Sequence, residues 1–131
     1  MKILNILGSH LAPKAKKILE EIGEVDDREV VYKELLDIVD QYDIIFVGLY
    51  PMIDKAVMDK AVKLKYVAIP ANTIENIDEE YAKSKGIAVV SLWGEHEFLN
   101  TITSTAELAC GLMIDIARFT PWAFDTVKNY K

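Results

Sequence analysis

A chain of 131 residues is long enough for one domain with a substantial apolar core, and its 51% hydrophobic and 27% charged residues exclude the composition of a disordered protein. The net charge of −6 argues against nucleic-acid binding, which usually needs a basic face. The single cysteine excludes an intrachain disulfide framework, and no apolar run reaches the roughly 20 residues that span a bilayer. Because Met1 leads directly into a strand-like segment, we expect a cytoplasmic protein with no membrane or nucleic-acid partner.

Strand-like and helical patterns alternate along the chain. Apolar residues form short runs bounded by turn residues in the strands, and recur at helical spacing in the helices. In order, we expect a strand at 2–7, a helix from Pro13 to Gly23, a polar edge strand at 24–31, a helix at 32–42, an apolar central strand at 43–49, a helix at 54–61, a strand at 65–69, a helix at 78–85, a strand at 87–92 and a long helix at 104–119.

This alternation predicts an α/β fold. Five β-α units imply a parallel sheet whose two faces are covered by helices, in a three-layer sandwich. The polar second strand belongs at an edge, and the flavodoxin-like order 2-1-3-4-5 is the simplest arrangement that keeps it there. We expect one domain over residues 1–131, with the long helix at 104–119 followed by a short trailing segment at 120–131.

Ligands of this architecture bind beyond the carboxyl ends of the strands. Here those ends lead into loops at 8–12, 48–53, 70–77 and 93–103. They lack the acids and the lysine of a phosphoryl-accepting receiver domain, and they are too poor in glycine and hydroxyl residues for a flavin phosphate loop. The chain also contains no GxGxxG and no GxxxxGK[ST], so no complete dinucleotide or triphosphate site is visible.

Nucleophilic and metal chemistry have little support in the sequence. Cys110 lies in an apolar helical pattern, which favours packing over a reactive thiolate. His10 and His96 lie in loops, and the acids Glu95 and Glu97 do not share a face with the imidazole between them. Because metal sites need convergent ligands, we expect none, and a hydrolase or metalloenzyme on this fold has no motif behind it.

The long helix is apolar over most of its circumference. Ser104 and Glu107 have the spacing of a capping box at its start. A helix of this kind needs partners on most sides, and one sheet cannot cover it. We therefore expect a homodimer through the region 104–131, packed or exchanged between subunits, with Trp122 and Phe124 as interface anchors; alternatively, these two aromatics cap their own core.

Two stretches resemble one known family. Residues 76–90, NIDEEYAKSKGIAVV, resemble the N-I-D-x-x-x-A-x-x-x-G-I-x-V segment of NAD-dependent D-isomer-specific 2-hydroxyacid dehydrogenases of the phosphoglycerate dehydrogenase type. Residues 100–113, NTITSTAELACGLM, are similar to the family's N-T-x-x-[SV]-x-A-E-x-x-x-G-L-M helix. Residues 2–25 and 43–68 also run parallel to the family, so the resemblance covers essentially the whole chain.

The resemblance implies that the family's two lobes have different functions. The family's enzymes have a flavodoxin-like lobe that helps to bind the substrate, and a Rossmann lobe that binds NAD and carries the catalytic Arg, Glu and His. This chain is similar to the first lobe alone, so the resemblance assigns it no catalytic residue. We expect no cofactor bound by this chain alone, although NAD serves the parent family, and we expect a small 2-hydroxy or 2-oxo acid as the parent substrate.

The resemblance also implies binding residues. Those for the substrate lie in the loop after the fourth strand: Ala71, Asn72, Thr73 and Ile74. Those beside the nicotinamide lie near the long helix: Asn100, Thr101 and Ser104. The family often has glycines at the positions of Ala71 and Thr73, and an arginine at that of Gly48. Since glycine permits a close backbone approach, these replacements alter the place where a carboxylate would bind.

Two hypotheses follow. The first is an isolated substrate-binding lobe, which has no turnover alone because hydride transfer needs both a bound nicotinamide and a positioned acid–base group. The second is a free-standing flavodoxin-like module, natural or designed, that binds a small ligand or self-associates; the replaced glycines and Gly48 favour it. The parent reading frame beyond Lys131 separates the two.

Overall fold

The computed structural model describes residues 1–130, so Lys131, the end of the expected 120–131 segment, lies outside the described residues. The chain divides into two compact units, Met1–Gly94 and Glu95–Lys131. The expectation of a single domain over residues 1–131 stays a prediction.

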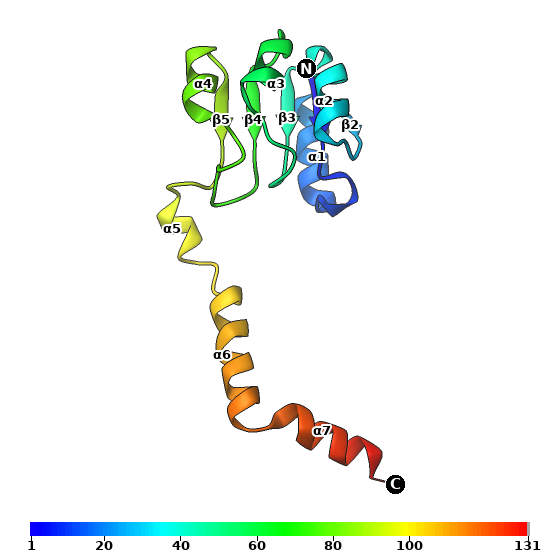
Figure 1. Cartoon of the computed structure of the whole chain (residues 1–131), viewed down its shortest axis with the longest axis vertical. Coiled ribbons are helices and arrows are strands. Elements are labelled where there is room, and N and C mark those ends of the chain that lie inside the picture. Colours follow the sequence, from blue (N-terminus) through cyan, green and yellow to red (C-terminus); the bar gives the residue numbers. More distant parts are fainter. Residues whose placement is uncertain (131) are drawn as a thin grey trace. The chain divides into compact units, whose positions relative to one another are not determined.

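The first unit contains a five-stranded parallel sheet (Figure 1). Its order, β2-β1-β3-β4-β5, confirms the expected α/β topology. The strands are β1 (Lys2–Asn5), β2 (Glu24–Asp27), β3 (Ile44–Phe46), β4 (Tyr66–Ala68) and β5 (Ala88–Val90). The helices are α1 (Pro13–Ile22), α2 (Tyr32–Ile38), α3 (Lys55–Lys60) and α4 (Glu79–Ser84), with 3-10 turns η1 (Gly8–His10) and η2 (Val39–Gln41).

Every strand is shorter than its sequence pattern predicted, and β1 shows why. The side-chain oxygen of buried Asn5 accepts a hydrogen bond from the Leu7 N–H at 3.2 Å. The backbone therefore turns into η1 after Asn5, although Leu7 continues the apolar pattern. Side-chain-to-backbone bonds of this kind offer the chain an alternative to the ladder of a sheet.

One face of the sheet supports the core. The register places Leu4, Ile45 and Val67 in one row, and all three are fully buried. Leu35 of α2 and Val57 of α3 belong to the same apolar cluster. Helices α2, α3 and α4 lie side by side over this face, with Asp54 and Asp78 accepting N–H bonds as the caps of α3 and α4.

The opposite face is buried at one end only. Its row runs through Ile3, Ile44 and Tyr66, whose exposed fractions rise from 0% through 8% to 42%. Ala88, next in the row on β5, is exposed as well. Helix α1 contacts β2 and has no buried residue of its own. Apolar surface therefore opens toward β5 on this side.

The second unit consists of α5 (His96–Leu99), α6 (Ser104–Ala117) and α7 (Thr120–Asn129). The expected cap of the long helix was wrong, because Thr103 occupies the cap position and its hydroxyl donates to Glu107 at 2.6 Å. The helix also ends before Phe119, whose positive φ of 55° separates α6 from α7. The trailing segment is thus itself helical.

Helices α6 and α7 bury none of their residues. Cys110, for which packing was expected, is exposed. The ring centroids of Phe119 and Trp122 lie 5.4 Å apart, and both aromatics are exposed, as is Phe124. Among the described residues, no helix combines the length and apolarity needed to cross a membrane.

Candidate functional site

Hydrogen bonds tie the carboxyl ends of β1 and β2 together. The Asn5 amide donates to Asp27 at 2.7 Å, and Lys16 of α1 forms an ion pair with the same carboxylate. The hydrogen bond from Lys16, followed by that from Asn5, holds the pKa of Asp27 below its usual range. Both Asp27 oxygens are therefore engaged within the protein, and this end of the sheet is occupied by structural contacts.

A second network links β2 to Tyr42, which precedes β3 in the chain. Tyr42 is buried, and its hydroxyl donates to Asp26, which also pairs with the Arg28 guanidinium at 2.8 Å. Burial, and then the bond to Asp26, raises the pKa of Tyr42 to about 12. The Tyr42 bond is in turn the largest cause of the lowered pKa of Asp26. Arg28 is thus held by a carboxylate at the edge of the sheet.

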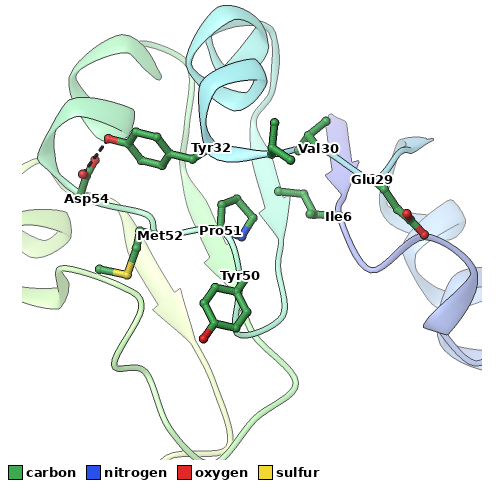
Figure 2. A pocket seen from close by; sticks show the side chains of 9 residues that line it. Ile6, Glu29, Val30, Tyr32, Tyr50, Pro51, Met52 and Asp54 are labelled. Atoms are coloured by element: carbon green, nitrogen blue, oxygen red, sulfur yellow. Dashed lines mark hydrogen bonds between the residues drawn. The ribbon is translucent and has the colours of Figure 1, made fainter.

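A cavity of about 680 Å³ lies where the loops after β1, β2 and β3 meet, and we refer to it as the apolar cavity (Figure 2). Figure 2 shows Asp54 and Tyr32 at one end of it and Glu29 at the other, with apolar side chains between. The lining residues are Ile6, Glu29, Val30, Val31, Tyr32, Tyr50, Pro51, Met52 and Asp54. The volume lies within the roughly 300–1,000 Å³ common for small-ligand sites.

The polar groups at one end of the apolar cavity are paired with each other. The Tyr32 hydroxyl donates to one oxygen of Asp54 at 2.8 Å, and the other oxygen accepts the Val57 N–H at 3.1 Å as the cap of α3. The bond to Asp54 is the main cause of the raised pKa of Tyr32. Asp54 is thereby fixed, and the Tyr50–Pro51 peptide of the adjacent wall is cis.

Sequence reasoning missed most of this cavity. The pattern of residues 24–31 predicts a strand throughout, whereas β2 ends at Asp27 and residues 29–31 line the apolar cavity. The charged run Asp26-Asp27-Arg28-Glu29 was a signal that could have ended the strand earlier, because such residues are depleted in strands. The predicted loop at 48–53 does contribute Tyr50, Pro51 and Met52.

The predicted substrate loop follows β4 as expected. Thr73 lines a second cavity of about 310 Å³, which we call the loop cavity, together with Leu49, Tyr50, Met52, Glu75 and Asn76. Tyr50 and Met52 also line the apolar cavity, so the two cavities share a wall. Among the described residues, no group accepts a hydrogen bond from the backbone N–H groups of residues 71–74. These donors remain available.

Asn76 anchors this loop to the loop after β3. Its side chain is 6% exposed, and its amide nitrogen donates to the carbonyls of Gly48 at 3.0 Å and Pro51 at 3.3 Å. Its own backbone carbonyl accepts the Ile53 N–H at 2.8 Å. The side-chain oxygen of Asn76 has no partner among the described residues. On the other side, the Ala71 carbonyl accepts the Leu92 N–H at 3.0 Å.

Gly48 sits close to the loop after β1. A Cβ added there would lie 2.9 Å from the Cδ2 atom of Leu7, so any larger residue requires the end of the Leu7 side chain to move. Within residues 1–130, no arginine or lysine lines either of these two cavities. Binding of a carboxylate at this edge would therefore depend on backbone donors within the described part of the chain.

The three predicted cofactor residues lie together at the junction of α5 and α6. Asn100 follows α5 and donates its N–H to His96 at 2.9 Å, and the Thr101 hydroxyl donates to Phe98 at 2.7 Å. Ser104 is the first residue of α6, and Asn100, Thr101 and Ser104 are all exposed.

The turn after β1 does not have the features of a pyrophosphate-binding site. A pyrophosphate is normally held by a glycine-rich turn and the free N–H groups of the helix that follows. Here β1 leads through η1 into α1, whose first residue, Pro13, has no N–H to donate. Within residues 1–130, no group of three or more His, Cys, Asp or Glu side chains is placed to hold a metal ion.

Comparison with known proteins gives concordant matches. The family model described as D-isomer specific 2-hydroxyacid dehydrogenase, catalytic domain, matches residues 5–110. A D-3-phosphoglycerate dehydrogenase from Methanocaldococcus jannaschii is 37% identical over 116 residues, which are 88% of this chain and 21% of that protein. A hydroxypyruvate reductase from Thermotoga maritima is 31% identical over 108 residues, or 82% of this chain and 34% of that protein.

Solved structures show the same likeness. A protein from Thermus thermophilus superimposes with a TM-score of 0.78 at 25% identity, over 99% of this chain and 41% of that one. A D-lactate dehydrogenase from Escherichia coli gives a TM-score of 0.67 at 17% identity, over 99% of this chain and 41% of that one, which supports the fold alone. The chain therefore spans between about a fifth and two fifths of these proteins.

Proposed function

Because the chain belongs to the D-isomer specific 2-hydroxyacid dehydrogenase family, we propose that it is the substrate-binding lobe of an enzyme that interconverts a 2-hydroxy acid and the corresponding 2-oxo acid. In this proposal NAD is bound by a further part of the parent enzyme. Hydride transfer requires the protein to hold both a nicotinamide and an acid–base group, so residues 1–131 have no turnover alone.

The observation that carries the proposal is the set of available N–H groups at Ala71, Asn72, Thr73 and Ile74. A carboxylate is an acceptor with two oxygens, and successive backbone N–H groups form concave sites for such anions. Asn76 fixes the base of this loop through Gly48 and Pro51, so the donors are attached to an ordered edge of the sheet. The acid group of the substrate would thus lie against the loop cavity.

The second candidate is a free-standing flavodoxin-like module that binds a small ligand or self-associates. It is favoured by Gly48, where the family often has an arginine, and by Ala71 and Thr73, where it often has glycines. A natural stop codon after Lys131 would support this candidate. A reading frame that continues into a strand and GxGxxG would support the first.

We also propose a homodimer through the region 104–131. The exposed side chains of α6 and α7 include Leu112, Met113 and Ile116 as well as Trp122 and Phe124. Burying one large apolar side chain contributes on the order of 1.5–3 kcal/mol, so a partner helix gains most by covering this surface. A second copy presents the same surface in a closed, self-complementary contact. Sedimentation of a monomer at tens of micromolar would contradict the proposal.

A cytoplasmic location is part of the same proposal. Its support is the single exposed cysteine, Cys110, which suits a reducing compartment.

Titration of the 15N-labelled chain with pyruvate tests the main proposal. We expect pyruvate to shift the amide resonances of residues 71–74, whereas pyruvamide, which lacks the carboxylate, leaves them in place. NADH added with pyruvate should remain unoxidised. Unmoved resonances at 71–74 in saturating pyruvate would exclude the proposed substrate loop, and oxidation of NADH by this chain would overturn its assignment as an inactive lobe.

A further inference from the structure

The apolar cavity has walls suited to a hydrocarbon group. Ile6 and Pro51 are buried, and Val30 packs against the core, so this wall is apolar. On the wall shared with the loop cavity, Met52 adds a flexible thioether side chain. Tyr50 adds an aromatic ring, and Figure 2 shows both side chains beside Pro51.

The charges around this cavity are acidic. Glu29 and Asp54 line it, and among residues 1–130 no lysine or arginine does. Arg28, next to Glu29, is directed to Asp26, and Lys55, next to Asp54, lies over the Tyr81 ring at 5.3 Å. An anionic group placed in this cavity would meet two carboxylates without a counter-ion among the described residues.

The cavity also continues from the proposed acid-binding loop. Tyr50 and Met52 line both cavities, so a molecule whose carboxylate rests on the N–H groups of Ala71 to Ile74 has its remaining part next to the shared wall. Glu75, which also lines the loop cavity, is another carboxylate. Hydrocarbon therefore fits the apolar cavity better than an anionic extension.

We propose that the apolar cavity holds the side chain of the acid, and that this lobe selects 2-oxo and 2-hydroxy acids with branched aliphatic or aromatic side chains over acids with a phosphorylated one. The inference rests on the proposed function, because it places the acid group at residues 71–74. It sets this chain apart from its Methanocaldococcus jannaschii relative, which is named for phosphoglycerate. Discrimination comes both from apolar burial and from the repulsion of a phosphate by Glu29 and Asp54.

The test compares two 2-oxo acids on the full chain labelled at its amides and methyl groups. The probes are 4-methyl-2-oxopentanoate and 3-phosphohydroxypyruvate. We expect the first to shift the methyl resonances of Val30 and Met52 together with the amides of residues 71–74, and to bind at least about tenfold more tightly than the second.

The outcomes separate the two proposals. Equal or tighter binding of the phosphorylated acid, with the amides of 71–74 shifted, would overturn the side-chain selection and leave the proposed function standing. Unmoved amides at 71–74 with both acids would overturn the proposed function and the selection with it. Shifted amides without any response from the Val30 and Met52 methyls would place the side chain elsewhere and overturn the selection alone.

Two variants with matched controls address the cause. Glu29→Gln removes one repelling charge without a change of size, so the phosphorylated acid should bind about threefold more tightly or better. Its control, Glu79→Gln, changes a residue outside both cavities and should leave this affinity unchanged. Met52→Lys should reverse the preference between the two acids, whereas Val62→Lys should leave it unchanged. The two sites are 47% and 79% exposed, so both lysines are tolerated by the fold. An unaltered preference in Glu29→Gln and Met52→Lys would contradict the inference.

Discussion

The two units of the chain are both rich in apolar residues, yet only the first buries them. In Met1–Gly94 the apolar residues fall in short strand runs and at helical spacing, so sheet and helices cover one another over Leu4, Ile45 and Val67. In the second unit α6 is apolar nearly all round and has no buried residue. An apolar pattern therefore indicates that a segment needs a partner, and periodicity alone does not say whether the partner lies in the same chain.

Truncation of a leucine in each unit tests whether the first unit buries its apolar residues and the second does not. Leu35→Ala removes a side chain that is 0% exposed and should cost about 2–5 kcal/mol of unfolding free energy. Leu112→Ala removes one that is 53% exposed and should change stability by less than about 0.5 kcal/mol where the chain is monomeric. Urea unfolding of both variants measures the difference, and equal losses would show that α6 is buried after all.

The proposed dimer would give the exposed apolar residues of the second unit a partner. Trp122→Ala should weaken self-association by about 2 kcal/mol or more, or roughly thirtyfold, because large aromatics dominate interface energies. The measurement is the dissociation constant from sedimentation equilibrium. Val62→Ala, an exposed apolar residue of the first unit, is the control and should leave it unchanged. If the Trp122→Ala chain has the same dissociation constant as the parent chain, α7 is not part of the interface.

Removal of the Asn76 hydrogen bonds in the first unit should have a smaller effect on stability. Asn76→Ala leaves the carbonyls of Gly48 and Pro51 without their donor and should cost about 1–3 kcal/mol. Asn72→Ala, in the same loop but exposed, should change stability little. Thermal unfolding of the two variants decides the matter: similar melting temperatures would mean that Asn76 does not hold the two loops.

The smallest expected effect concerns alkaline pH. The folded pKa of Tyr42 is raised from about 10 to about 12, so the folded state favours the neutral phenol. The stability due to Tyr42 is complete below pH 10 and is lost as the pH rises through 12. Tyr42→Phe should cost about 0.5–1.5 kcal/mol at pH 7 and flatten the decline between pH 10 and pH 12 relative to the parent chain. A parallel decline in both chains would exclude Tyr42 as its source.

Much of the first unit could be predicted because its signals are local. The run at 43–49 is apolar enough for a central strand, Pro13 starts a helix and Gly86 ends one, and the polarity of 24–31 puts β2 at an edge. The order 2-1-3-4-5 followed from these observations and the connection rules for parallel sheets.

The exact ends of the strands could not be predicted, because they depend on side chains that meet only in the fold. Asn5 ends β1 by accepting the Leu7 N–H, and nothing in the local pattern distinguishes this amide from any other polar residue. The apolar cavity was missed for a similar reason. Its walls come from residues 6, 29–32, 50–52 and 54, which are brought together by the register of β1, β2 and β3 rather than by a motif.

Under the proposed function, the amide of Asn76 would influence selectivity among related acids. Because one side chain bonds the carbonyls of Gly48 and Pro51 while its backbone belongs to the loop after β4, the two loops cannot shift apart without losing both bonds. The spacing between the N–H groups of residues 71–74 and the wall at Pro51 is therefore set by covalent and hydrogen-bond lengths. A lobe with a fixed spacing of this kind would discriminate by the length of a side chain as well as by its polarity, and homologous straight-chain acids would bind with an optimum in carbon number.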